Sequence, residues 1–178
     1  KLLIYLKMQQ NKKNLPSLVV NSNSSNIDCL TLFFSCMEKF IGASFFSKIY
    51  LFIDKTQYSP PSYVEVINYD SKDNFKNQMV KCLSAVKEEF ILYCNEDYLF
   101  YDECNLNLAE QLLKEMEDSE FSFVKFVHTN LEVYKNYKPN LLVIDGQNEN
   151  NFSQTLSFWK VKDFLKIHEN CPDSEIGE

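Results

Sequence analysis

Residues 88–100 read Glu88-Glu89-Phe90-Ile91-Leu92-Tyr93-Cys94-Asn95-Glu96-Asp97-Tyr98-Leu99-Phe100, an apolar run that ends in an amide and two acids. An apolar run of this length without Gly or Pro predicts a central β-strand that is covered on both faces. Side chains alternate along a strand, so we expect Asn95 and Asp97 to point one way and Glu96 the other. Because ligands of open α/β sheets bind outside the carboxyl ends of the strands, Asn95 and Asp97 are predicted to face a ligand crevice.

Two interpretations of Asn95-Glu96-Asp97 are open at this point. An Asp at the end of a central strand is a good oxygen ligand for a hard divalent cation. Asn and Asp are also ordinary turn residues, so the three residues could simply end the strand and begin a polar turn.

Length and composition predict one globular domain. The 178 residues are 45% hydrophobic, 15% aromatic and 24% charged, a balance that disordered chains do not have. We expect a single domain over residues 1–178, with residues 1–14 as an N-terminal extension. Whether the chain is truncated at its C terminus is left open. No apolar run is long enough to span a bilayer and no signal segment opens the chain, so we expect a soluble, cytoplasmic protein without a transmembrane segment.

The charge of the chain narrows the class of partner. The net charge of −7 disfavours nucleic acid and anionic bilayers, which are held mainly by neutralisation of phosphate groups. All 18 basic residues are Lys, so a bound phosphate would depend on Lys, backbone amides or a metal rather than on the Arg fork. The six cysteines show no C-x-x-C spacing, which predicts reduced thiols and no zinc site.

Periodicity predicts alternating strands and helices along the chain. We expect helices over residues 27–40, 74–86, 106–116 and 161–169, and strands over 15–20, 48–53, 63–67, 90–94, 121–127, 141–144 and 152–159, with the rest of 130–151 irregular. This alternation favours a three-layer α/β/α sandwich around a mostly parallel central sheet. The chain has three glycines and therefore no G-x-G-x-x-G fingerprint and no phosphate loop, which disfavours dinucleotide oxidoreductases and P-loop enzymes. It also has no G-x-S-x-G elbow, which disfavours a hydrolase of that type.

Three segments resemble GT-A-fold glycosyltransferases, close to the family-2-like group. They are residues 18–23, 74–100 and 152–165, and the similarity covers most of residues 17–178. The resemblance implies a fold of the nucleotide-diphospho-sugar transferase type. It also identifies residues 95–97 with the Asp-x-Asp motif of that family, with Asn95 in place of the first acid.

The resemblance implies a set of site residues. Asp97 would bind Mn²⁺ or Mg²⁺ against the diphosphate of the donor, and Trp159 would line the acceptor side. The residues that would bind the donor nucleoside are Asn21, Ser22, Asn23, Asp54, Asn68, Asp70, Gln78 and Asn95. An inverting reaction needs a carboxylate that takes the acceptor proton, and the acidic C-terminal segment offers Glu175 first and Asp173 second.

The expected function is therefore metal-dependent transfer of a sugar from a nucleotide-diphosphate sugar, first of all a UDP-sugar, to a glycan or other hydroxyl acceptor. One alternative is a non-catalytic module of the same fold that binds a nucleotide sugar or a partner, which the substitution at Asn95 favours. A nucleotidyltransferase is a third hypothesis. It expects a Gly-rich first loop with Lys or Arg, and residues 21–26 contain neither.

Overall fold

The computed structural model describes residues 15–55, 58–126, 134–138, 141–144 and 156–172. The predicted N-terminal extension and the acidic segment with Asp173 and Glu175 lie outside the described residues, as do residues 152–155 of one predicted strand.

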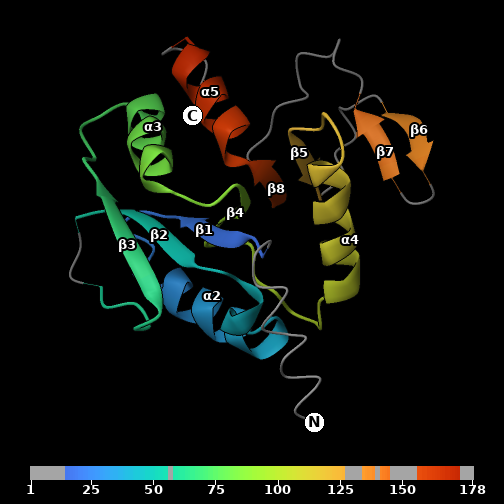
Figure 1. Cartoon of the computed structure of the whole chain (residues 1–178). Helices are drawn as coiled ribbons and strands as arrows, with labels where there is room; N and C mark the ends of the chain where they lie inside the picture. Colours follow the sequence, from blue (N-terminus) through green and yellow to red (C-terminus); the bar gives the residue numbers. More distant parts are fainter. Residues whose placement is uncertain (1–14, 56–57, 127–133, 139–140, 145–155, 173–178) are drawn as a thin grey trace.

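A six-stranded sheet forms the centre of the molecule (Figure 1). In the order of the sheet its strands are β3 (Val64–Tyr69), β2 (Ile49–Asp54), β1 (Ser17–Asn21), β4 (Phe90–Asn95), β8 (Ser157–Lys160) and β5 (Phe123–Lys125). Strands β3, β2, β1 and β4 run parallel, and β8 runs antiparallel to both of its neighbours. The prediction of a mostly parallel sheet is therefore confirmed.

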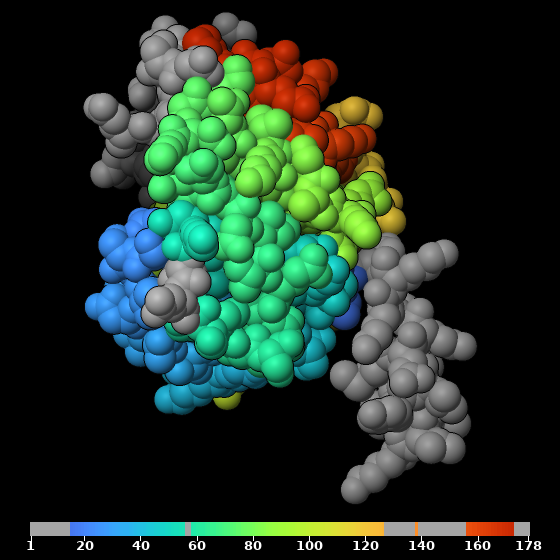
Figure 2. All heavy atoms as spheres, turned by 90° about the vertical axis from the view of Figure 1, so that its left-hand side faces the viewer, coloured from blue at the N-terminus to red at the C-terminus, as the bar shows by residue number. Residues whose placement is uncertain are grey.

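In the described part of the chain, four α-helices cover the two faces of this sheet (Figure 1; Figure 2 shows the molecule from the side of β3). They are α2 (Ile27–Phe40), α3 (Phe75–Ala85), α4 (Leu106–Glu117) and α5 (Val161–Asn170). The buried apolar side chains of α2 and α4 belong to one core cluster, and those of α3 and α5 to the other. The result is the predicted three-layer α/β/α sandwich, with a short 3-10 helix, η2 (Ala43–Phe45), after α2.

Alternation along the central strands explains the two cores. In β1, Leu18 and Val20 pack in the cluster under α2 and α4, whereas Val19 packs under α3 and α5. In β4, Leu92 packs in the cluster under α2 and α4, and Ile91 packs in the cluster under α3 and α5. A strand buried on both faces must be apolar at every position, which is why these segments read as unbroken apolar runs in the sequence.

The helix boundaries follow from local chemistry. Asn74 and Asn105 cap α3 and α4, each by accepting a hydrogen bond from the backbone N–H three residues on. After α2, Gly42 adopts a φ of +84° and donates its N–H to the Met37 carbonyl at 2.9 Å, which ends the helix. Within the described residues, no helix is both long and apolar enough to cross a membrane.

Two parts of the prediction differ from the structure. The strand expected over 121–127 is shorter, because among the described residues only Phe123–Lys125 pair with β8. Within residues 130–151, which were expected to be irregular apart from 141–144, the structure has a further strand, β6 (Tyr134–Lys138). It pairs antiparallel with β7 (Leu141–Ile144) in a separate two-stranded sheet. The polar sequence YKNYK gives little signal for a strand, because hydrogen bonds to β7 rather than an apolar pattern define it.

Candidate functional site

The candidate site lies where the parallel strands end. Asn21, the last residue of β1, is paired with Asn95 of β4 on one side and with Phe52 of β2 on the other. From β1 the chain passes through α2 to β2, while β4 joins β1 on its opposite edge. Crevices in open α/β sheets form at the carboxyl ends of strands where the connections diverge in this way.

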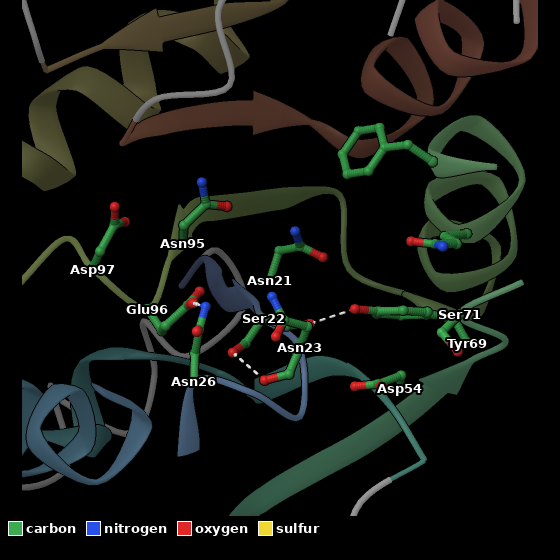
Figure 3. Close-up of a pocket in the computed structure, with 12 residues that line it drawn as sticks. Asn21, Ser22, Asn23, Asn26, Asp54, Tyr69, Ser71, Asn95, Glu96 and Asp97 are labelled. Carbon is green, nitrogen blue, oxygen red and sulfur yellow. Dashed lines mark hydrogen bonds between the residues drawn. The ribbon is translucent and has the colours of Figure 1, made fainter. Parts of the chain in front are cut away.

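A pocket of about 520 Å³ opens at this edge (Figure 3). It is lined by the strand ends, the β1–α2 loop and the first turn of α3, with the side chains Asn21, Ser22, Asn23, Asn26, Asp54, Tyr69, Ser71, Phe75, Gln78, Asn95, Glu96 and Asp97. Volumes of this size are typical of small-molecule sites. The lining is dominated by amides, hydroxyls and carboxylates.

Seven of the predicted site residues come together in this pocket. They are Asn21, Ser22, Asn23, Asp54, Gln78, Asn95 and Asp97. These residues are up to 76 positions apart in the chain (97 minus 21), and the shared edge of the parallel strands brings them together.

Two residues that were predicted to contact the nucleoside, Asn68 of β3 and Asp70 just after it, do not line the pocket. Asn68 is exposed and donates its side-chain amide to the carbonyls of Ile53 and Asp54, at 3.2 and 3.3 Å. Asp70 is exposed and accepts a hydrogen bond from the Lys72 N–H. Tyr69, between them, points to the other side of the strand and does line the pocket.

The expectation that Trp159 lines an acceptor site is wrong. Its side chain is 0% exposed and is stacked on Phe123 and Phe164, with 4.4 Å between ring centroids in both pairs. Its Nε1 donates to the Ser157 hydroxyl at 2.8 Å. The reason is that β8 is an interior strand of the sheet, so a residue of β8 that faces α5 is covered completely.

The alternation predicted for Asn95, Glu96 and Asp97 does not extend past Asn95. Strand β4 ends at that residue, and Glu96 and Asp97 form a turn. Glu96, which was expected to point away from the crevice, lines the pocket, is 6% exposed and accepts a hydrogen bond from the side chain of Asn26. In Figure 3, Glu96 is directed at Asn26, while Asn95 and Asp97 extend away from that pair.

The β1–α2 loop, residues 22–26, is held by side chains at the ends of three other strands of the sheet, β3, β2 and β4. The Tyr69 hydroxyl at the end of β3 donates to the Ser22 carbonyl at 2.6 Å. Asp54 at the end of β2 accepts from the Ser24 N–H at 2.5 Å and from the Ser24 hydroxyl at 2.7 Å. Glu96, directly after β4, accepts from Asn26. Each strand end thus contributes one side chain to one wall of the pocket.

The electrostatics of the pocket are those of an acidic site. Among the described residues, the lining includes three carboxylates, Asp54, Glu96 and Asp97, and no Lys. Burial, together with the smaller effect of the nearby Asp54, raises the pKa of Tyr69 to about 12, so this hydroxyl remains a donor at neutral pH. Burial also raises the pKa of the Cys29 thiol, to which Asp28 and Glu96 add.

The donor set suits a cation that is shared with a ligand. Within the described residues, no group of three or more His, Cys, Asp and Glu side chains is placed to hold a metal ion by itself. Mg²⁺ and Mn²⁺ at nucleotide sites are held by one or two carboxylates together with phosphate oxygens and water. The exposed carboxylate of Asp97 at the pocket edge fits that requirement.

Five lining residues were not predicted as site residues: Asn26, Tyr69, Ser71, Phe75 and Glu96. For Tyr69 the signal was present, since it lies between two residues that were named. Phe75 reads as part of the apolar face of α3, and its ring does pack near His168 of α5, with 6.0 Å between centroids. Periodicity cannot show that the same ring also reaches the pocket.

Comparison with known proteins supports the fold. No protein-family model matches the chain, and no curated protein sequence matches it. Among solved structures, it is similar to 2-C-methyl-D-erythritol 4-phosphate cytidylyltransferase (IspD) of Francisella tularensis, with a TM-score of 0.52 and 14% sequence identity. The match covers 92% of this chain and 82% of that one. That enzyme is a nucleotidyltransferase with a GT-A-like fold of the nucleotide-diphospho-sugar transferase type, so the fold class is as predicted.

Proposed function

We propose that this chain is a metal-dependent glycosyltransferase. Its donor would be a nucleotide-diphosphate sugar, with a UDP-sugar as the leading candidate. The observation that carries the proposal is the pocket at the ends of β1 to β4, with Asp97 at its edge and amide side chains along its wall. Its position, volume and polar lining suit a nucleoside and two phosphates.

In this proposal Asp97 would hold Mn²⁺ or Mg²⁺ against the donor diphosphate, and Asn95, two residues earlier in the chain, also lines the pocket. The cation would supply the positive charge that stabilises the leaving diphosphate. Since the lining contains no Lys among the described residues, the diphosphate depends on that charge and on amide donors. Asn21, Ser22, Asn23 and Gln78 would bind the nucleoside.

The proton of the acceptor hydroxyl would be taken by Glu175, or else by Asp173. One contact supports this assignment. Lys76 of α3 donates a hydrogen bond to the carbonyl of Cys171 at 2.9 Å, and Phe75, which precedes Lys76, lines the pocket. Cys171 therefore lies next to the helix that forms one side of the site. A chain extends by at most about 3.5 Å per residue, so residues two to four positions beyond Cys171 can lie at most about 7 to 14 Å from it.

A second candidate function is nucleotidyl transfer, which the likeness to a cytidylyltransferase brings forward. The described pocket argues against it, because a nucleoside triphosphate carries more charge than a diphosphate and the lining offers carboxylates rather than Lys. The non-catalytic binding module of the same fold is the third candidate, because an amide at Asn95 weakens a cation site.

Calorimetry and product analysis separate the three candidates. We expect UDP to bind in the presence of Mn²⁺ and much more weakly in EDTA, and a UDP-sugar to release UDP slowly when no acceptor is added. Release of pyrophosphate from CTP would instead identify a nucleotidyltransferase. Metal-dependent binding of UDP without hydrolysis or transfer of any sugar would identify the binding module, and the absence of all nucleotide binding would contradict the proposal as a whole.

A further inference from the structure

We infer that Asp54 is a positioning residue, which holds the β1–α2 loop through Ser24 and so shapes the pocket, rather than a direct contact of the nucleoside. The inference rests on the proposed function for what the pocket binds. Its structural part depends only on contacts within the protein.

Both carboxylate oxygens of Asp54 already accept a hydrogen bond within the protein. One of its carboxylate oxygens accepts the Ser24 N–H at 2.5 Å, and the other accepts the Ser24 hydroxyl at 2.7 Å. Both oxygens are therefore engaged by a single residue of the loop. Hydrogen bonds to a carboxylate are about twice as strong as neutral ones, so this pair is a firm attachment of the loop to β2.

In the middle of the loop, the hydrogen bonds other than those to Asp54 are internal, whereas its ends are also attached to the sheet, where the Ser22 N–H donates to the Phe52 carbonyl at 2.9 Å. The Asn23 side-chain oxygen accepts from the Ser25 N–H at 2.9 Å, and the Asn23 carbonyl accepts from the Asn26 N–H at 3.1 Å. These bonds form a turn but do not connect it to the sheet. Asp54 binds the middle of the loop, and Tyr69 and Glu96 bind its two ends.

The consequence for binding concerns preorganisation. Asn23 and Asn26 line the pocket and flank Ser24 in the chain, so a loop fixed at Ser24 presents both side chains in place. A loop that must become ordered on binding lowers affinity without the loss of any direct contact. Removal of Asp54 should therefore weaken nucleotide binding through increased loop motion.

The test begins with amide hydrogen exchange in the ligand-free protein. In Asp54→Ala the Ser24 N–H loses its acceptor, and we expect it to exchange at least about tenfold faster than in the wild type. Asp54→Asn keeps one oxygen acceptor and should give an intermediate rate. Asp102→Ala is the matched control, because the exposed Asp102 also accepts one backbone N–H, from Glu103, outside the pocket. An unchanged Ser24 rate in Asp54→Ala would overturn the inference.

A double-mutant cycle on the dissociation constant of UDP with Mn²⁺ supplies the second measurement. If Asp54 acts through Ser24, Ser24→Ala weakens binding in the wild type but has little further effect in Asp54→Ala. Additive effects of the two substitutions would show a direct contact of Asp54 with the ligand, against the inference. Absence of UDP binding by the wild type would contradict the proposed function instead, while the exchange rates would still decide the role of Asp54.

Discussion

At the scale of single residues, the proposal for the metal depends on Asp97. We expect Asp97→Asn to abolish the part of UDP binding that depends on Mn²⁺, a loss of at least about tenfold in affinity, because an amide is a poorer ligand for a hard cation than a carboxylate. Since Asp97 is exposed, its replacement should leave the free energy of unfolding unchanged. Calorimetric titration of UDP with Mn²⁺ and with EDTA measures the effect.

Asp102→Asn is the control for this prediction. Asp102 is an exposed acid five residues further along the same loop, and it is not part of the pocket lining. The variant should bind UDP with the wild-type dependence on Mn²⁺. If Asp97→Asn also retained that dependence, Asp97 would not be the metal ligand.

Because His168 is buried, we expect the free energy of unfolding to depend on pH. Burial against Phe75 and Phe164 lowers its pKa from 6.5 to about 4, so the folded protein holds it neutral. Between pH 6.5 and pH 4 the unfolded chain binds a proton that the folded protein does not. The free energy of unfolding should therefore fall as the pH is lowered through this range, by about 2 kcal/mol from pH 7 to pH 5.

Urea unfolding of the wild type and of His168→Leu at both pH values checks this expectation. Leu fills a similar volume without a titrating group, so the difference between the two proteins isolates the contribution of His168. An equal loss of stability in both proteins on acidification would show that other groups are responsible.

At the scale of elements, the packing of β8 against α5 decides the role of Trp159. Because the indole lies between Phe123 and Phe164, we expect Trp159→Ala to lower the free energy of unfolding by about 3 to 5 kcal/mol. Chemical denaturation followed by circular dichroism measures this change. Tyr101→Ala, at an aromatic side chain that is 88% exposed, should stay within about 0.5 kcal/mol of the wild type.

Fluorescence offers an independent check on the same element. Trp159 is the single Trp of the chain, so its emission reports on this position alone. We expect blue-shifted emission that acrylamide quenches poorly. Strong quenching in the native protein would place the indole at the surface and would restore a role in acceptor binding.

At the scale of the whole molecule, the sign of the charge predicts how salt affects binding. The chain has a net charge of −7, and three of its carboxylates line the described pocket, where there is no Lys. In EDTA, UDP is therefore repelled, and raising NaCl from about 0.05 M to about 0.5 M should screen the repulsion and strengthen binding. A site built from basic residues would show the opposite dependence. Titrations of UDP at the two salt concentrations distinguish these cases.

The sequence by itself determined most of the elements, although not β6, and it determined the fold class. Apolar runs such as Phe90–Cys94 predicted strands buried on both faces, and the structure has β4 at residues 90–95. Helical spacing placed the α-helices of the described residues, α2, α3, α4 and α5, to within one or two residues of their observed ends. Polar residues directly after the apolar runs marked the carboxyl ends of the parallel strands. Since ligands of open α/β sheets bind at those ends, the sequence predicted where a pocket would lie.

Only the tertiary structure decided which polar residues of those strand ends meet, and in what role. Glu96 joins the pocket because β4 ends one residue before it, and Trp159 is excluded because β8 lies inside the sheet. Asp54 is bound by Ser24, thirty residues earlier in the chain. Periodicity describes which face of its own element a side chain occupies, whereas a site depends on the register between strands, which no single segment encodes.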